Sequence, residues 1–263
     1  MANTEKSKQI KKKIIGKYGK FKMYLVDDET IRNKAEYSEE FSDYGVNIGK
    51  KGLPTLNFKF IPEDEIWIAR SLKPSERHFI IENALHYIRG IERKMDPGDA
   101  YDSALRYEKA QRTKDALSKY HLKLKKEITY PLHSEIPGKV YIKKYGTIHD
   151  EGDDVKIYLI KGEVVRDLYK TDYVEGGHAY VYNWIPKDEI WIESSVKPDE
   201  IPVILLHEFL ERTLMKFRHF PYVRAHVAAS KAEFEHRGIF TKKDALNLTR
   251  KIVINKLLRY IKY

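Results

Sequence analysis

The chain of 263 residues contains no cysteine, and this absence excludes several kinds of chemistry. Disulfide bonds, thiolate catalysis and cysteine-based zinc sites cannot form, so a metal ion must bind to histidine or to acidic side chains. No run of about 18 apolar residues occurs, which predicts that no helix spans a membrane. Residues 1–13 are charged without an apolar stretch behind them, so we expect no secretory signal and a cytoplasmic location.

Positive charge is concentrated in three segments, residues 1–22, 112–126 and 237–263, which together carry +19 in a chain of net charge +10. Such segments attract polyanions through counterion release, so nucleic acid or another polyanion is a candidate partner. A lysine-rich composition is also typical of heat-adapted proteins, which is the alternative interpretation. The candidate nucleic-acid contacts are Lys11, Lys12, Lys13, Lys123, Lys125, Lys126, Arg250 and Lys251.

An internal repeat indicates how the chain is organised. Residues 61–76 and 185–200 are identical at 11 of 16 positions, with Trp67 opposite Trp191. Weaker matches continue upstream and downstream of these segments. Repeats of this length indicate tandem copies of one domain. We therefore expect a basic N-terminal segment at 1–17, a first copy at 18–133 and a second copy at 134–263.

The order of patterns within each copy predicts an α+β fold. In the second copy we expect a hairpin around Lys161-Gly162 and strands at 178–184 and 189–193. Three helices follow, and Thr241 begins the last of them with a capping box to Asp244. The prediction is a tandem duplication of a small domain with a short antiparallel sheet followed by three helices on one face. We expect the two copies to form an intramolecular interface in a pseudo-two-fold arrangement.

The most specific pattern lies on the apolar helix at residues 204–215. His207 and Glu211 are four residues apart, so they share a helix face and can hold one ion. Glu208 is positioned as a general base for an attacking water. The next helix carries His226 and Glu233 on one face, and either side chain completes three ligands. Without cysteine this donor set favours zinc bound by histidine and carboxylate.

The segment at residues 189–212 resembles the strand–loop–helix unit of minimal zincin-like metallopeptidases, in the style of the ImmA/IrrE domains of prokaryotic mobile elements. In that family an apolar helix carries His-Glu-x-x-His, and a later helix supplies the third ligand. The resemblance implies that His207 is the first ligand and that Glu208 is the base. Glu211 stands where the family has its second histidine, so the motif is incomplete.

The first copy carries an altered version of this pattern. If one gap is allowed, residues 82–86 align with residues 207–211, and Asn83 replaces the general base. Glu108 then aligns with Glu233. Glu82, His86 and Glu108 are therefore the expected degenerate counterpart of the second site.

Three functional hypotheses follow. The leading one is a duplicated zincin-like protein without catalysis, which acts as a binding or structural module. A His–Glu pair at i, i+4 stabilises a helix by a few tenths of a kcal/mol with no metal at all, which is compatible with that hypothesis. The alternatives are a metal-dependent hydrolase or peptidase that uses the second copy, and a nucleic-acid-binding protein that uses the basic segments.

Overall fold

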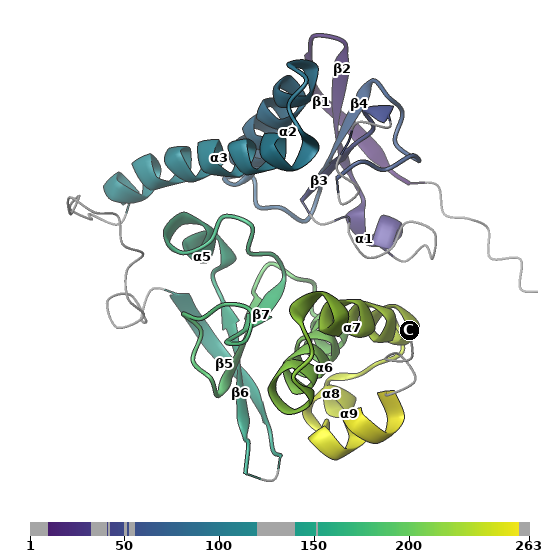
Figure 1. The fold of residues 1–263 in the computed structure, drawn as a ribbon, viewed down its shortest axis with the longest axis vertical. Helices are drawn as coiled ribbons and strands as arrows, with labels where there is room; N and C mark the ends of the chain where they lie inside the picture. Colours follow the sequence, from purple (N-terminus) through teal and green to yellow (C-terminus); the bar gives the residue numbers. More distant parts are fainter. Residues whose placement is uncertain are drawn as a thin grey trace, which may run out of the picture. The chain divides into compact units, whose positions relative to one another are not determined.

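The computed structural model describes residues 10–32, 41, 43–49, 52, 56–119, 140–150 and 152–257. The chain divides into two compact units, residues 1–111 and 112–263. Each unit contains a four-stranded sheet with helices (Figure 1). The expected boundary between residues 133 and 134 lies outside the described residues.

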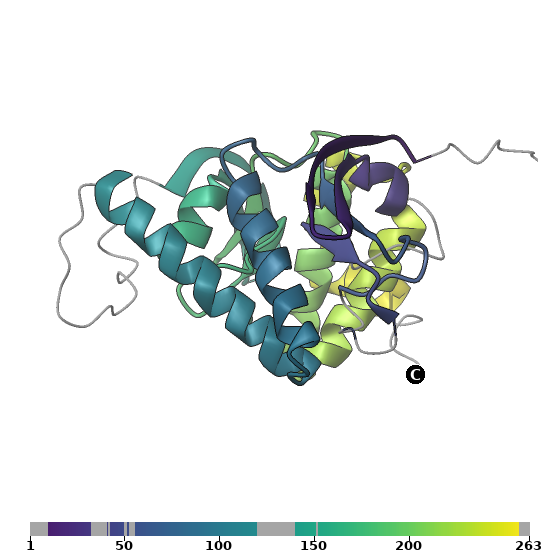
Figure 2. The ribbon, with the colours of Figure 1, turned by 90° about the horizontal axis from the view of Figure 1, so that it is seen from above.

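The first unit has a sheet of strand order β1-β2-β4-β3. Its helices α2 and α3 pack together beside the turn that joins them, where Gly90 lies against Ala100 (Figure 2). The elements are β1 (Lys12–Tyr18), β2 (Phe21–Val26), α1 (Asp28–Arg32), β3 (Tyr44–Val46), β4 (Glu65–Ala69), α2 (Arg77–Glu92) and α3 (Pro97–Lys119), of which residues up to 111 belong to this unit.

The second unit repeats this strand order as β5-β6-β8-β7. Its longest helix, α6, packs against α7 and against the sheet. The elements are β5 (Tyr141–Ile148), β6 (Val155–Ile160), α5 (Gly162–Leu168), β7 (Gly176–His178), β8 (Glu189–Glu193), α6 (Ile201–Arg218), α7 (Tyr222–His236), α8 (Lys242–Leu246) and α9 (Arg250–Leu257).

The two sheets share their register as well as their strand order. Tyr24 pairs with Trp67 in the first unit, and Tyr158 pairs with Trp191 in the second. Each indole N–H donates to the glutamate two residues earlier, at 2.7 Å in both units. The repeated sequence therefore corresponds to a repeated local structure, from the pairing of the strands to the tryptophan contact.

The expected antiparallel sheet is wrong for its central pair, because β2–β4 and β6–β8 are parallel. The hairpin expected at Lys161-Gly162 is also wrong, since α5 occupies residues 162–168. Val164, Val165 and Leu168 are buried on one side of this helix, which suits a helical period better than a strand. The helix lies between β6 and β7 in sequence, and the connection between the parallel strands β6 and β8 runs through α5 and the antiparallel edge strand β7.

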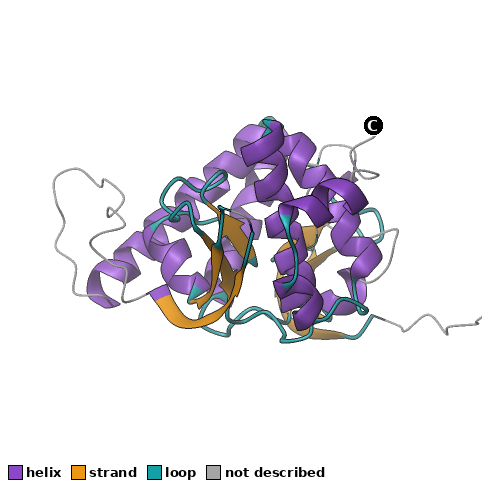
Figure 3. Ribbon diagram, turned by 90° about the horizontal axis from the view of Figure 1, so that it is seen from below, coloured by secondary structure: helices purple, strands orange, loops and turns teal. Residues whose placement is uncertain are grey.

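Helices cover both faces of the second sheet, not one. Ile190 and Ile192 pack with α6, whereas Trp191 between them packs with α5 and several aromatic rings. This alternation is the two-residue period of a strand that is buried on both faces. Figure 3 shows the strands of each unit and the helices around them.

Two further expectations are corrected. The strand expected at 178–184 ends at His178, and the aromatic side chains after it form a packed cluster in which Tyr182 stacks on Trp184. The last helix is interrupted at residues 247–249, which separates α8 from α9. Its capping box is confirmed, because Thr241 and Asp244 exchange both hydrogen bonds.

The helices that follow the first sheet also differ from expectation. Three helices are expected after the sheet, but α3 runs without a break from Pro97 to Lys119, and the described residues of the first unit contain only α2 and α3 after β4. None of the helices in the described part of the chain combines the length and the apolar character that crossing a bilayer requires.

Gly162 provides a test of the close packing around α5. A Cβ atom there would lie 2.2 Å from Cδ of Glu193, and Arg166 holds that carboxylate with hydrogen bonds of 2.7 and 2.8 Å. We expect Gly162→Ala to lower the opening free energy of β8 by about 1–3 kcal/mol, because the carboxylate cannot move away. Hydrogen exchange of the β8 amides in the full chain measures this change.

The matched control for this prediction is Gly98→Ala, in the first turn of α3, where the new Cβ would meet only Oδ1 of Asp96 at 3.1 Å. We expect this control to change the opening free energy of α3 by less than about 0.5 kcal/mol. Unchanged protection of β8 in Gly162→Ala would contradict the packing described here.

Candidate metal centre

The candidate centre lies where α6, α7 and β7 meet in the second unit. Pro202 in the first turn of α6 favours the start of the helix, where an N–H group has no partner within the helix. The helix is then almost entirely apolar, and its side chains from 201 to 214 are buried. His207, Glu208 and Glu211 are exceptions to this apolar character, and they face the same region of the interior.

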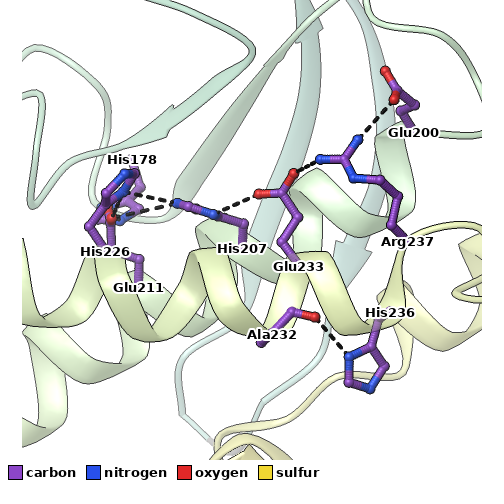
Figure 4. Close-up of polar contacts among 9 residues, drawn as sticks. All are labelled: His178, Glu200, His207, Glu211, His226, Ala232, Glu233, His236 and Arg237. Atoms are coloured by element: carbon purple, nitrogen blue, oxygen red, sulfur yellow. Dashed lines mark hydrogen bonds and ion pairs between the residues drawn. The ribbon is translucent and has the colours of Figure 1, made fainter. Parts of the chain in front are cut away.

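Three ligand atoms form a compact triangle at this point (Figure 4). Nδ1 of His226 lies 3.2 Å from Nε2 of His207 and 2.9 Å from Oε2 of Glu211. The third side, from Nε2 of His207 to Oε2 of Glu211, measures 3.7 Å. Tetrahedral zinc with bonds of about 2.0–2.1 Å holds its ligand atoms about 3.3–3.4 Å apart. The triangle therefore has the size of one face of a zinc tetrahedron.

Glu233 lies on the opposite side of the His207 ring and is not part of the triangle. Its Oε2 contacts Nδ1 of His207 at 2.8 Å. Arg237 forms an ion pair with the other oxygen of Glu233, and the same guanidinium bonds Glu200 at 2.9 Å. This row of alternating charges, visible in Figure 4, fixes the orientation of the His207 ring.

Glu208 has a different environment from the other two acids. It is 8% exposed, and no hydrogen bond reaches its carboxylate from the described residues. It lies against the backbone of β7, because a Cβ atom at Gly176 would be 2.7 Å from Oε1 of Glu208. Its carboxylate, His178 and Glu211 each offer an atom within 4.8 Å of the others. The carboxylate of Glu208 thus fills the space that Gly176 leaves and accepts no hydrogen bond from the residues that the structure describes.

His178, which the sequence patterns did not single out, completes the polar cluster. The residue is fully buried at the end of β7, and its Nε2 lies 3.1 Å from Oε1 of Glu211. No helical spacing connects it with the residues on α6, since it comes from a strand 33 positions away from Glu211. Only the pairing of β7 at the edge of the sheet brings it to the site.

Burial and neighbouring charges shift the pKa values of the cluster in different directions. Burial, opposed by His207 and reinforced by nearby acids, raises the pKa of Glu208 to about 8. Burial also acts to raise the pKa of Glu211, but hydrogen bonds from three imidazoles outweigh it and lower the pKa. Burial would lower the pKa of His207, yet bonds to Glu211 and Glu233 raise it. A bound cation would add positive charge beside these acids and would favour the ionised form of Glu208.

The three side chains of the triangle differ in their exposure to solvent. The His226 side chain is 45% exposed, whereas that of Glu211 is 3% exposed. Tyr222 stacks on the His226 ring, with centroids 5.3 Å apart. A catalytic metal site needs one open position for water or substrate, and the exposed side of His226 is where this site can provide it.

The first unit has no equivalent centre at the corresponding positions. α2 and α6 begin directly after Glu76 and Glu200, so they align without a gap, and Asn83 corresponds to His207. Asn83 donates to Glu108 at 2.7 Å and accepts a hydrogen bond from Tyr44 at 2.9 Å. Tyr44 occupies the register position of Gly176. A tyrosine, an amide and a carboxylate thus occupy the place in the first unit that corresponds to the candidate centre.

The alignment with one gap, and the counterpart built on it, are corrected by this geometry. The ligand atoms of Glu82, His86 and Glu108 do not lie within 4.8 Å of one another. His86 instead contacts Ser103 at 3.0 Å and stacks on Tyr107. The gap aligned Glu82 and His86 with His207 and Glu211, a His–carboxylate pair in swapped order. The repeat at 61–76 and 185–200 instead continues without a gap into both helices, which makes Asn83 the counterpart of His207.

The basic candidates occupy varied environments. Lys12 pairs with Glu65 at 2.7 Å and lies over the Tyr24 ring. Arg250 lies 3.9 Å from Asp150 and stacks on Phe217. Lys11, Lys13 and Lys251 are exposed, whereas Lys123, Lys125 and Lys126 lie outside the described residues. Binding of nucleic acid stays a prediction.

Comparisons with protein-family models, with curated proteins and with solved structures found no match for this chain. The zincin-like resemblance therefore rests on the residues of the second unit alone.

Proposed function

We propose that the second unit is a metal-dependent hydrolase domain of the zincin-like kind, with one zinc ion held by His207, Glu211 and His226. The observation that carries this proposal is the triangle of ligand atoms, with sides of 2.9, 3.2 and 3.7 Å. These distances bracket the roughly 3.3–3.4 Å that a zinc tetrahedron requires. A helix-stabilising His–Glu pair alone would not need His226 at the same point.

The donor set supports zinc despite the incomplete motif. Two imidazole nitrogens and one carboxylate oxygen form a ligand set that catalytic zinc sites use in peptidases. Glu211 replaces a histidine on the first helix, but His226 supplies a histidine on the second helix. The ligands therefore carry the same total charge as those of any His₂Glu site. Glu211 does not make the ion a weaker Lewis acid than the ion in such a site.

Glu208 is the residue that we assign to proton transfer. When bound, zinc would supply a Lewis acid for an attacking water and positive charge among the buried acids. That positive charge would favour the ionised form of Glu208 against the effect of burial. The Glu208 carboxylate then accepts the proton from the water as its oxygen attacks a carbonyl carbon. The same group then gives the proton to the leaving nitrogen as the C–N bond breaks. No hydrogen bond from the described part of the chain occupies the Glu208 carboxylate, so it is available for this exchange.

The first unit is, in this proposal, a copy of the same ancestral domain without the catalytic residues. The equal strand order and the equal register of Trp67 and Trp191 support a tandem duplication. Asn83 and Tyr44 replace His207 and Gly176 in its interior, so it contributes structure or binding but no metal ligand.

The first test is metal stoichiometry in the full chain. After loading with Zn²⁺ and dialysis, we expect one zinc ion per chain by elemental analysis. Glu211→Gln removes the only anionic ligand, so we expect zinc affinity to fall by at least tenfold. His86→Gln is the matched control in the first unit, and we expect it to keep one zinc ion per chain. Zinc content independent of Glu211 would contradict the assigned ligands.

The second test separates catalysis from metal binding. We expect the zinc-loaded chain to cleave members of a fluorescence-quenched peptide mixture. Glu208→Gln keeps the size of the side chain but cannot accept the proton, so we expect the cleavage rate to fall by roughly 10²–10⁴-fold with zinc content unchanged.

The control for this test is Glu82→Gln on α2, which should leave cleavage unchanged. Cleavage that persists at the full rate in Glu208→Gln would exclude Glu208 as the base. If the zinc-loaded chain cleaves none of the peptides, the catalytic part of the proposal fails and the metal-binding module remains.

A further inference from the structure

Glu211 divides its two carboxylate oxygens between two different histidines. Oε2 belongs to the triangle with His207 and His226. Oε1 faces away from it, toward Nε2 of His178 at 3.1 Å. Both Glu211 and His178 are buried, at 2% and 0% exposure, so water does not compete for this contact.

The backbone determines which nitrogen of His178 carries a proton. The amide N–H of Tyr180 points to Nδ1 of His178 at 3.2 Å. A backbone N–H can only donate, so Nδ1 must accept with its lone pair. The proton of the neutral ring is then on Nε2, which donates to Oε1 of Glu211.

His207 has the opposite arrangement. Its Nδ1 faces the carboxylate of Glu233 at 2.8 Å, and a carboxylate accepts a hydrogen bond from this nitrogen. The lone pair of the neutral ring is therefore on Nε2, the atom in the triangle. In their neutral forms the two buried histidines therefore differ, because only His207 has its lone pair on the nitrogen that faces Glu211 and is available to bind a metal ion.

Two possible sets of metal ligands share Glu211, and the difference between the two histidines separates them. His207, Glu211 and His226 form one group, and His178, Glu208 and Glu211 form the other. The second group would need Nε2 of His178 as a ligand, but that atom carries a proton. A second ion bridged to the first by Glu211 is therefore disfavoured by the hydrogen bond from Tyr180.

We propose that His178 is a positioning residue that donates a hydrogen bond to Oε1 of Glu211, so that Glu211 binds a single metal ion through Oε2 alone. This inference rests on the proposed function. Occupation of Oε1 prevents the carboxylate from chelating the ion with both oxygens, which leaves the fourth position of the tetrahedron open. At the equivalent strand position the first unit, which has no such centre, carries Val46.

The test uses the full chain loaded with Co²⁺, which reports coordination number through its visible absorption. Four-coordinate Co²⁺ absorbs more strongly than five-coordinate Co²⁺. We compare the wild type with His178→Phe, which keeps the ring volume without the donor, and with His178→Gln, whose amide N–H can take the place of Nε2–H. Affinity for Co²⁺ is measured in parallel by competition with a chelator.

We expect one Co²⁺ ion per wild-type chain with strong, four-coordinate absorption. His178→Phe should weaken the absorption, because Glu211 rotates to chelate the ion, and should lower the affinity by 10–100-fold. His178→Gln should restore most of both properties. A purely structural role for His178 would lower the thermal stability of the metal-free chain without changing the absorption spectrum.

Several results would overturn this inference. Wild-type spectrum and affinity in His178→Phe would overturn it and leave the proposed function intact, whereas a wild type that binds no Co²⁺ would overturn both. Two Co²⁺ ions per chain would make His178 a ligand. If His178→Phe does not fold, long-range ¹H–¹⁵N spectra of the wild type still decide, because a proton on Nδ1 of His178 contradicts the inference.

Discussion

The contact between Glu233 and Nδ1 of His207 is the interaction on which the candidate centre depends. It holds the imidazole so that Nε2 faces Glu211 and His226, and Arg237 with Glu200 keeps the carboxylate in place. Without that contact the ring could turn within a mostly apolar helix face, and the triangle would be lost. Support of this kind behind a ligand is what distinguishes a metal site from a chance group of polar side chains.

The same scaffold holds two different interiors. In the second unit Gly176 leaves room for Glu208, and histidines on three elements converge. In the first unit Tyr44 fills the equivalent space and bonds Asn83. Both solutions satisfy buried polar groups, which a folded interior requires. Only the second solution gathers imidazole and carboxylate at one point, so the repeat does not by itself imply two active sites.

Local sequence patterns predict much of the architecture. Contacts between residues that are far apart in the sequence cannot be predicted from such patterns. The alternation at 189–193, the helix at His207 and the Thr241 capping box follow from neighbours in sequence. Lys161-Gly162 resembles a turn and so predicts a hairpin, whereas this glycine begins α5 and lies against Glu193. His178 could not be found, since its relation to Glu211 depends on strand pairing. The sequence does not decide whether His226 or Glu233 joins His207 and Glu211, because that depends on how α7 is rotated relative to α6.

X-ray absorption at the zinc edge of the loaded, full-length chain tests the central claim most directly. The account predicts one zinc ion with two imidazole nitrogens and with oxygens from one carboxylate and one water, all at about 2.0–2.1 Å. Multiple scattering from the imidazole rings identifies the histidine ligands. A spectrum of oxygen ligands alone, with no imidazole contribution, would contradict the account.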